Sequence, residues 1–282
     1  MNFIEQCKGK DLDNVPASKL LKDNWYLSRK FDGNYVQIHK VGKDVKFYTS
    51  GNKEFFIPEV ANELVSLNPE DSFILECEYI GTSEGKLGDR TKACKLTTYR
   101  TNFEKKLGTQ FDSRERFKAF DLIIPNMSFE GREQILDSLK LGNFIDKVIY
   151  FGPMTLDGAK DTAKLWCNQG YEGCYLKQIS HKQESGKRVN TAIKLKYRKT
   201  IDLKCIDIIE GTGKYTNCIG SLVLKDSKGR IVAVGSGLSD TDRYRDNSYF
   251  LNKIVEMEYE QIIDTYIQPT FIRVRDDKEI ED

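Results

Sequence analysis

The chain has 282 residues, of which 39% are hydrophobic and 31% charged, and its 44 Lys and Arg residues against 43 Asp and Glu give a net charge of +1. This length suits one or two domains, and this composition excludes disordered and collagen-like chains. Because the net charge is close to zero, any surface that binds phosphates must be a local cationic patch.

Signals that direct a protein to a membrane or out of the cell are not found in the sequence. No apolar run approaches the roughly 20 residues that a membrane span requires, and residues 1–6 carry no basic patch followed by an apolar stretch. We therefore expect a cytoplasmic protein that is not secreted and has no membrane partner. The seven cysteines are widely spaced and lack a C-x-x-C pair, which predicts neither a disulfide framework nor a zinc site.

Strands dominate the predicted elements of the first 200 residues, because apolar and polar residues alternate with period two. The predicted strands are residues 25–28, 35–39, 73–79 and 117–124. Helical spacing is less frequent, and it begins after Pro58, which suits the first turn of a helix. The predicted helices are residues 59–67, 133–141 and 161–168.

The chain after residue 199 differs from the rest, because short predicted strands follow one another closely, with one helical stretch at residues 240–247. The strands are residues 201–210, 221–225, 231–235, 254–259 and 270–274. The turn from Asp226 to Gly229 fits a hairpin in which the glycine adopts a positive φ. This pattern is typical of a small barrel such as an OB-fold, so we place a domain boundary near residue 199.

Lys30 opens a Lys-Phe-Asp-Gly sequence between two predicted strands. By itself, a lysine beside Asp-Gly is more often a solvated turn residue. An amine can nevertheless attack the α-phosphate of a nucleotide once it is deprotonated, and clustered cations favour that form. Such cations follow, because Lys194 and Lys196 share one strand face, about 7 Å apart, where they could clamp one phosphate. The alternative for this pair is an amphipathic strand with a solvated face.

A second cationic strand lies near the C-terminus. Alternation places Phe271, Arg273 and Arg275 on one of its faces. The alternative is a charged surface at the end of the chain.

Two carboxylates complete the candidates. Glu78 lies among apolar residues of a predicted strand, where an unpaired acid is costly, so a role on a metal ion or a ribose hydroxyl would explain it. Glu172 opens another strand, and a carboxylate with nucleotide phosphates is a common way to hold Mg²⁺. Glu172 and Lys177 have opposite parity, so we do not assume that they share a face.

Two other catalytic classes are excluded. A P-loop needs a glycine upstream of Gly-Lys, and residues 211–214 lack it. A Ser-His-Asp hydrolase is not expected, because the chain has no G-x-S-x-G motif and only His39 and His181 as histidines.

Six short motifs occur in one order and resemble those of the covalent nucleotidyltransferases, in particular the ATP-dependent DNA ligases in a minimal viral or phage-like form. The matches to motifs I, III, IIIa, IV, V and VI are residues 30–33, 75–79, 117–123, 172–177, 193–196 and 275–278. Residues 220–240 also resemble the OB domain of DNA ligases, which RNA ligases usually lack together with motif VI.

This resemblance implies an α+β fold in two domains. Residues 1–198 would form a nucleotidyltransferase (adenylation) domain of ATP-grasp-like antiparallel sheets with helices, and residues 199–282 would form an OB-fold β-barrel. A hinge between residues 197 and 201 would let the OB domain close for the first reaction step and swing away afterwards.

The resemblance also implies a monomer that uses ATP and Mg²⁺ or Mn²⁺ to seal nicks in duplex DNA, wherever viral or cellular DNA is replicated. Lys30 would attack the α-phosphate of ATP, release pyrophosphate and carry AMP. The AMP would pass to the 5′-phosphate of the nick, and the 3′-hydroxyl would then displace it.

The matched positions receive roles in the nucleotide site. Phe120 would stack on adenine, Glu78 would contact the ribose, and Lys194 and Lys196 would hold the α-phosphate. Ser28, Asp32 and Gly33 are assigned to the same site.

The remaining roles concern the metal and the leaving group. Glu172, together with Glu78, would bind the divalent metal. Arg275, Asp277 and Lys278 would orient pyrophosphate.

Two arginines of the family pattern are missing. Motif I usually continues K-x-D-G-x-R, but Tyr35 stands at the arginine position, and Ser50 lies in a segment where S-R-x-G is usual. The replacement cations that we predict to bind nucleic acid are Arg90, Lys92, Arg100 and Arg188, with Lys95, Lys182 and Lys187 as further candidates. The alternative for these residues is solvated loop charge.

The expected enzyme is minimal. Few residues separate Glu210 from Gly220, which leaves no room for the long DNA-encircling hairpin of some compact ligases, and no further DNA-binding domain is expected before Lys30. DNA affinity should therefore rest on phosphate contacts and fall steeply with salt.

Two alternatives remain open. An RNA ligase or an mRNA-capping guanylyltransferase shares the lysine chemistry but uses other substrates. A non-catalytic OB-type nucleic-acid-binding protein would carry a degenerate nucleotide domain, against which the intact Lys30, Glu78 and Glu172 argue.

Overall fold

The structure is a computed structural model, and it describes residues 2–90, 92–97, 111–262 and 264–280. It divides into two compact units, Met1–Lys196 and Tyr197–Asp282. The predicted boundary, after residue 198, differs from this division by two residues. None of the helices in the described ranges has both the length and the apolar character that a membrane crossing requires.

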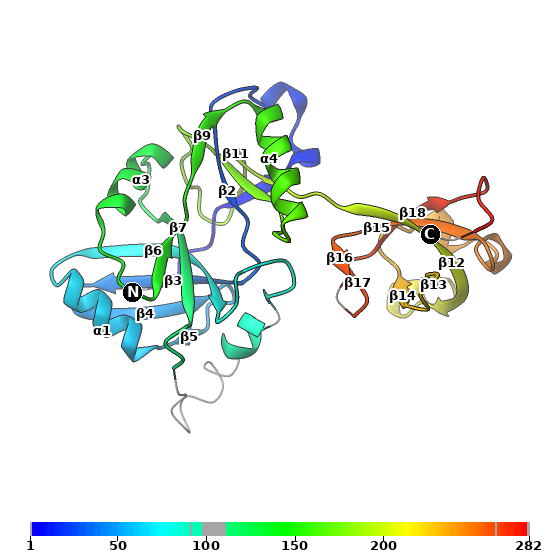
Figure 1. The fold of residues 1–282 in the computed structure, drawn as a ribbon, viewed down its shortest axis with the longest axis horizontal. Helices are drawn as coiled ribbons and strands as arrows, with labels where there is room; N and C mark the ends of the chain where they lie inside the picture. The colour runs from blue at the N-terminus through cyan, green and yellow to red at the C-terminus, as the bar shows by residue number, and fades with distance from the viewer. Residues whose placement is uncertain (1, 91, 98–110, 263, 281–282) are drawn as a thin grey trace. The chain divides into compact units, whose positions relative to one another are not determined.

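A six-stranded sheet forms one half of the first unit, in the order β5-β4-β3-β6-β7-β8 (Figure 1). Its strands are β3 (Asn34–Val41), β4 (Asp44–Thr49), β5 (Glu54–Phe55), β6 (Ser72–Gly81), β7 (Arg116–Leu122) and β8 (Ile145–Lys147). Helix α1 (Pro58–Leu67) begins with its proline in the first turn and buries Val60, Ala61 and Leu64 in the core of this sheet.

A five-stranded sheet forms the other half, in the order β1-β11-β10-β2-β9. Its strands are β1 (Lys8–Asp11), β2 (Trp25–Arg29), β9 (Phe151–Met154), β10 (Cys174–Gln178) and β11 (Arg188–Leu195). Helix α4 (Leu156–Asn168) packs on β2 and β10, and the short helices η1 (Leu12–Asn14) and η2 (Ala17–Lys19) follow β1. The chain leaves β2 of this sheet and enters β3 of the other, so residues 30–33 lie where the two sheets meet.

Two helices of the first unit begin earlier than predicted. Helix α3 (Phe129–Ser138) starts after Ser128, whose side chain accepts a hydrogen bond from the backbone of Gly131. Helix α4 starts after Thr155, whose side chain caps it in the same way. The predicted ranges 133–141 and 161–168 were therefore wrong at their starts, because a polar cap sets a helix start independently of the apolar spacing that follows.

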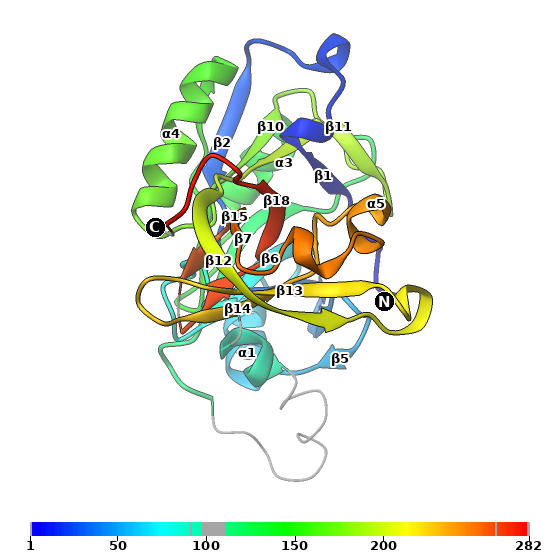
Figure 2. The ribbon, with the colours of Figure 1, turned by 90° about the vertical axis from the view of Figure 1, so that its right-hand side faces the viewer.

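The second unit is built on a five-stranded antiparallel sheet in the order β14-β13-β12-β15-β18. Its strands are β12 (Lys199–Glu210), β13 (Ile219–Lys225), β14 (Ile231–Val234), β15 (Ile254–Tyr259) and β18 (Thr270–Val274). The remaining elements are η3 (Gly213–Tyr215), α5 (Asp240–Arg243), η4 (Asn247–Tyr249), β16 (Gln261–Ile262) and β17 (Tyr266–Ile267). The first half of β12 pairs with β15 and its second half with β13, and Figure 2 shows the strong bend between them.

In place of the predicted β-barrel, the second unit has a curved sheet, and no strand ladder within the described residues closes it into a barrel. Strands β14 and β18 are its edges. They approach each other just beyond β14, where the backbone N–H of Phe271 donates to the carbonyl of Ser236 at 2.8 Å.

The C-terminal strand corrects one sequence prediction. Phe271 is buried in the core of the second unit, whereas Arg273 is 61% exposed. The pairing of β18 with β15 skips Ile272, and such a bulge reverses the alternation of faces along a strand. The prediction that Phe271 and Arg273 share a face was therefore wrong.

Candidate active site

A cavity of about 300 Å³ lies in the first unit, beside the turn that joins β2 to β3. Its lining includes residues from the N-terminal segment and from β1, β2, β3, β6, β7, β10 and β11. Six of the lining residues are cationic and one, Glu78, is acidic. The cations are Lys8, Arg29, Lys30, Arg90, Arg188 and Lys194. A local cationic patch is thus present in a chain whose net charge is close to zero.

Lys30 lies directly after β2, and its backbone N–H donates to the carbonyl of Gly173 at 3.0 Å. Its ammonium donates to one carboxylate oxygen of Glu172, while the ammonium of Lys196 contacts the other oxygen. Glu172 is only 7% exposed. Burial alone would raise the pKa of Glu172, but the two lysines outweigh it and hold this pKa below its ordinary value. The fold therefore joins predicted motifs I, IV and V through one carboxylate.

Glu78 and Gly33 form the next part of the lining. The backbone N–H of Gly33 donates to Glu78 at 3.0 Å. Burial raises the pKa of Glu78 to about 7, against the opposing effect of Lys30. A Cβ atom at position 33 would lie 2.5 Å from the carbonyl oxygen of Tyr79, so this close approach requires glycine. Asp32 accepts a hydrogen bond from the backbone of Gly88 at 2.6 Å.

One register row across the five-stranded sheet brings three polar side chains to the cavity. Ser28 on β2 pairs with Tyr175 on β10, which pairs with Lys194 on β11. All three line the cavity. The ammonium of Lys194 also contacts the carboxylate of Asp11 at 3.2 Å.

Phe120 lines the cavity, and its backbone carbonyl is held by buried side chains to which the sequence analysis assigned no role. The ammonium of Lys177 and the hydroxyl of Tyr150 both donate to the carbonyl of Phe120, at 3.0 Å each. Lys177 also contacts Asp121 at 2.7 Å, and both side chains are 3% exposed. Arg132 donates to the same aspartate at 2.7 and 3.0 Å.

Asp121 is the residue from which the sequence could have indicated this buried network. Asp121 stands in an apolar strand, and a buried charge requires a partner. Burial would raise the pKa of Asp121, but Lys177 and Arg132 hold it down at about 2. Lys177 contacts Asp121, whereas Glu172, which precedes β10 and does not open it as predicted, contacts Lys196.

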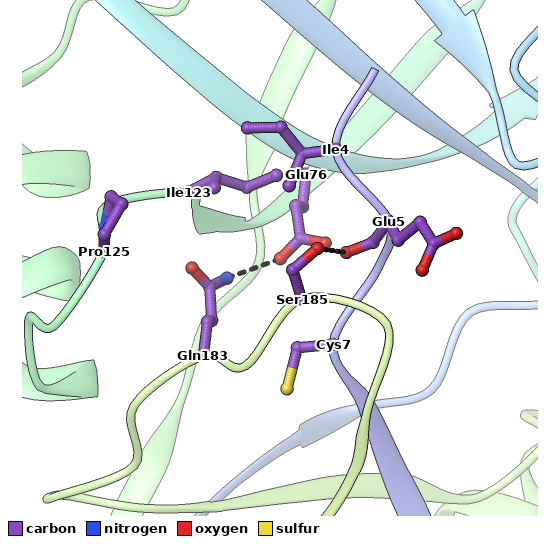
Figure 3. A pocket seen from close by; sticks show the side chains of 8 residues that line it. All are labelled: Ile4, Glu5, Cys7, Glu76, Ile123, Pro125, Gln183 and Ser185. Carbon is purple, nitrogen blue, oxygen red and sulfur yellow. Dashed lines mark hydrogen bonds between the residues drawn. The ribbon is translucent and has the colours of Figure 1, made fainter. Parts of the chain in front are cut away.

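Tyr35, at the position of the missing arginine, turns its hydroxyl away from the cations of the cavity. The hydroxyl donates to Glu76 at 2.6 Å, and the residue is 8% exposed. Glu76 also faces a second, smaller cavity, where Gln183 donates to its other oxygen (Figure 3). Ser50 lines the main cavity.

The predicted nucleic-acid-binding cations are distributed unevenly. Arg90 and Arg188 line the cavity. Lys92 is 75% exposed, pairs with Asp89 at 3.4 Å and is not among the lining residues. Arg100 lies outside the described residues.

The motif VI residues gather within the second unit around Asp202. The guanidinium of Arg275 contacts Asp202 and Asp277 at 2.8 Å each, and the ammonium of Lys278 contacts Asp202 at 2.5 Å. Asp202 is buried, at 4% exposure. These residues thus form one charged cluster of their own.

Comparison with known proteins agrees with this geometry. Residues 12–196, more than half of the chain, match the family model described as "ATP dependent DNA ligase domain". The chain belongs to the ATP-dependent DNA ligase family. Residues 210–275 of this ligase-family chain match the "DNA ligase OB-like domain", which confirms the predicted order of an adenylation domain followed by an OB-like domain.

Two curated relatives are similar to this ligase-family chain. A DNA ligase of Methanocaldococcus jannaschii is 26% identical over 246 residues, which cover 76% of this chain and 42% of the relative. A DNA ligase of Enterobacteria phage T6 is 27% identical and covers 97% of this chain and 62% of the relative. The chain therefore spans well under two thirds of the length of the archaeal relative.

Solved structures share the fold. A structure described as "DNA binding with a minimal scaffold: Structure-function analysis of Lig E DNA ligases" has a TM-score of 0.74 and 19% identity, and the match covers 97% of this chain and 100% of that one. A second structure, "Pmar-Lig_PreS3", has a TM-score of 0.76 and 19% identity, and the match covers 97% of this chain and 68% of that one.

Proposed function

We propose that this ligase-family chain seals nicks in duplex DNA with ATP, through a lysyl-AMP intermediate on Lys30. The observation that carries the proposal is the position of Lys30, which lines a cationic cavity and contacts Glu172, a carboxylate shared with Lys196. A nucleotide triphosphate suits such a cavity because its charge complements the six lining cations.

In the first step, the amine of Lys30 forms a bond to the α-phosphorus of ATP while the bond to pyrophosphate breaks. The ammonium must lose its proton beforehand. Glu172 orients the amine, and its low pKa makes it a weak base, so the proton leaves to water or to a departing phosphate oxygen. In the next two steps the 5′-phosphate of the nick displaces Lys30 from AMP, and the 3′-hydroxyl then displaces AMP.

The aromatic side chains of the cavity suit a purine base. Phe120 and Tyr175 both line it, and both rings lie within 6 Å of the ammonium of Lys177, at 5.5 and 5.9 Å. We assign base stacking to Phe120. Glu78, whose other oxygen is not used by Gly33, is assigned to a ribose hydroxyl.

The divalent cofactor of the proposal is Mg²⁺ or Mn²⁺. Within the described residues no group of three or more Asp, Glu, His or Cys side chains could hold a metal ion. Mg²⁺ in nucleotide sites usually takes only one or two carboxylates besides phosphates and water, so Glu172 and Glu78 fit such a site when ATP is bound. The metal would neutralise charge on the phosphates.

The proposed macromolecular partner is nicked duplex DNA, bound by a monomer in the cytoplasm or wherever DNA is replicated. Arg275, Asp277 and Lys278 are assigned to the pyrophosphate leaving group. Arg275 and Lys278 would have to separate from Asp202 for that role, since both contact it in this structure.

One labelling experiment tests the proposal. The protein is incubated with Mg²⁺ and α-labelled ATP or GTP, resolved on a denaturing gel, and then chased with nicked DNA or RNA duplexes. We expect a labelled band from ATP, its loss in Lys30→Ala, and sealing of DNA. A band from GTP alone would indicate a capping enzyme, sealing of RNA but not DNA would indicate an RNA ligase, and no band from either would contradict an enzyme.

A further inference from the structure

The turn that follows β18 carries the predicted motif VI residues and is held against the sheet of the second unit. Strands β12, β15 and β18 are neighbours in this sheet, in that order (Figure 2). The backbone N–H of Arg275 donates to the carbonyl of Ile254 at 2.8 Å, and the N–H of Lys278 donates to the carbonyl of Arg275 at 3.2 Å. Ile254 begins β15, and Glu256, two residues further on, pairs with Asp202 on β12. The turn therefore lies within reach of Asp202.

One carboxylate oxygen of Asp202 contacts both cations of the turn. This oxygen lies 2.8 Å from the guanidinium of Arg275 and 2.5 Å from the ammonium of Lys278. Asp277 binds the same guanidinium from another side, because Nε and Nη2 of Arg275 donate to its two oxygens at 2.8 Å each. Two carboxylates thus offset the charge of two cations at hydrogen-bond distance. A cluster with matched charges attracts a further anion only weakly.

The two carboxylates differ in their position. Asp277 is 66% exposed and belongs to the same turn as Arg275, so the two residues can move together. Asp202 is buried and lies 73 residues away in the chain, on β12. Its ion pairs fasten the turn to the sheet, and burial strengthens them because water screens them less. The contact of Asp202 with Arg275 and Lys278 is therefore the one that must break when these cations bind another anion.

We propose that Asp202 makes an autoinhibitory contact, which withholds Arg275 and Lys278 and which pyrophosphate must displace before these cations bind it. The inference rests on the proposed function for the role of the two cations and adds the acid that competes for them. A ligand that binds only the released cations loses apparent affinity in proportion to the fraction that is released. The contact of Asp202 therefore lowers the affinity of the protein for pyrophosphate.

The consequence for the reaction concerns its reversal. In the reverse of the first step, an oxygen of pyrophosphate forms a bond to the α-phosphorus of lysyl-AMP while the bond to the nitrogen of Lys30 breaks, which regenerates ATP and the amine. Once pyrophosphate has left, Asp202 binds Arg275 and Lys278 again. A returning pyrophosphate must then compete with a buried carboxylate, so the lysyl-AMP is protected until it meets a nick.

The test variant is Asp202→Asn, which keeps the size of the side chain and removes its charge. Asp207→Asn is the matched control, because Asp207 lies exposed on the same strand and the substitution changes the net charge equally. A triple variant adds Arg275→Gln and Lys278→Gln to Asp202→Asn. Thermal unfolding verifies that each variant is folded, and Asp202→Ser, which is also uncharged, replaces Asp202→Asn if that variant does not fold.

The first arm measures equilibrium binding of inorganic pyrophosphate to the full chain without nucleotide. We expect Asp202→Asn to bind pyrophosphate about 10-fold more tightly than wild type, which corresponds to a contact that is broken in about one molecule in ten. Asp207→Asn should differ from wild type by less than about 2-fold. The triple variant should lose the gain, because pyrophosphate that binds in the first unit is common to all variants. A residue with only a structural role would not strengthen binding when it is replaced.

The second arm measures the reversal itself. Protein that carries labelled AMP is mixed with increasing pyrophosphate, and the rate at which the label leaves is recorded. For Asp202→Asn we expect the half-maximal pyrophosphate concentration to fall by about 10-fold while the maximal rate stays unchanged, since the contact competes with binding and takes no part in the chemical step.

The proposal is overturned if Asp202→Asn binds pyrophosphate no more tightly than Asp207→Asn, if the gain persists in the triple variant, or if the half-maximal concentration does not fall. Failure of the proposed function is distinguishable from these outcomes. A wild-type protein that forms no lysyl-AMP would contradict the proposed function, whereas the first arm requires no lysyl-AMP and still decides whether Asp202 withholds the two cations.

Discussion

Lys30 and Glu172, 142 residues apart in the chain, form a direct ion pair beside the cationic cavity. Glu172→Gln keeps the shape but removes the charge that orients Lys30, so we expect lysyl-AMP formation to slow by about 10- to 100-fold. The measurement is the single-turnover rate with labelled ATP. Glu184→Gln, which alters an exposed ion pair with Lys187, is the control and should retain the full rate. Equal rates for the two variants would show that Glu172 does not orient the nucleophile.

The buried pair of Lys177 and Asp121 should matter for stability. Lys177→Met leaves Asp121 with Arg132 as its one remaining cation among the described residues, and loss of one partner of a buried pair typically costs about 3–5 kcal/mol. Lys160→Met removes an exposed partner of Asp157 and should change stability by less than about 1 kcal/mol. Both tryptophans, Trp25 and Trp166, lie in the first unit, so tryptophan fluorescence in urea follows this unit alone.

If Lys177→Met unfolded at the same urea concentration as Lys160→Met, the buried network would contribute little to the fold. A second readout is the affinity for ATP, because Lys177 also holds the backbone of Phe120. We expect this affinity to fall in Lys177→Met and to be unchanged in Lys160→Met.

Glu78 should make stability depend on pH. Burial raises the pKa of Glu78 from 4.5 to about 7, so the folded state holds a proton that the unfolded state releases between these pH values. Stability should therefore fall as the pH rises from 4.5 to 7, and a side chain that cannot ionise avoids this loss. Because Glu78 keeps some contact with solvent, we expect Glu78→Gln to be more stable than wild type by about 1–2 kcal/mol at pH 8 and equal to it near pH 4.5.

The check on Glu78 is a series of urea unfolding curves from pH 4.5 to 8.5. Glu84→Gln, at a position that is 74% exposed, is the control and should follow the wild-type pH dependence. A stability difference between Glu78→Gln and wild type that does not vary with pH would contradict the raised pKa.

Gly33 should not accept a side chain. A Cβ atom there would approach the carbonyl oxygen of Tyr79 to 2.5 Å and the Cγ of Glu78 to 2.9 Å, so Gly33→Ala must displace the turn that carries Lys30. We expect a loss of about 1–3 kcal/mol in stability, together with slower lysyl-AMP formation. Gly51→Ala is the control, since its nearest neighbour would be 4.0 Å away. The idea fails if the two alanine variants are indistinguishable in both measurements.

The hydroxyl of Tyr35 should stabilise the protein through Glu76. Tyr35→Phe leaves one oxygen of this buried carboxylate without its donor, so we expect a loss of about 1–2 kcal/mol. Tyr244→Phe, at a position that is 72% exposed, should change stability by less than about 0.5 kcal/mol. Urea unfolding of both variants decides the matter, and a neutral Tyr35→Phe would mean that the bond to Glu76 has no net effect on stability.

Much of the fold could be predicted from local patterns. Strands β15 and β18 have the predicted bounds, and Gly229 of the predicted hairpin turn has a φ of +84°. Alternation and turn chemistry act over a few residues, so a single segment contains the whole signal. Where the local signal was a helix cap, as at Ser128 and Thr155, apolar spacing alone placed the start too late.

The order of the motifs indicated the family and the candidate nucleophile, because the residue types that bind phosphates follow one another along this chain in the same order as in the family. The partners of those residues could not be predicted in the same way. Asp121 needs Lys177 and Arg132, which come from β10 and α3, and the bulge at Ile272 depends on how β18 pairs with β15.

The sequence by itself therefore determined the family, the two-domain order and the place of Lys30 at a turn between strands. Only the tertiary structure decided which charges are neutralised. Lys30 and Lys196 share Glu172, whereas Lys8 and Arg188 pair across parallel strands and have no acidic partner among the described residues. The physical reason is that the energy of a charge depends on distances and burial, and these are set by pairings between segments more than 100 residues apart in the chain.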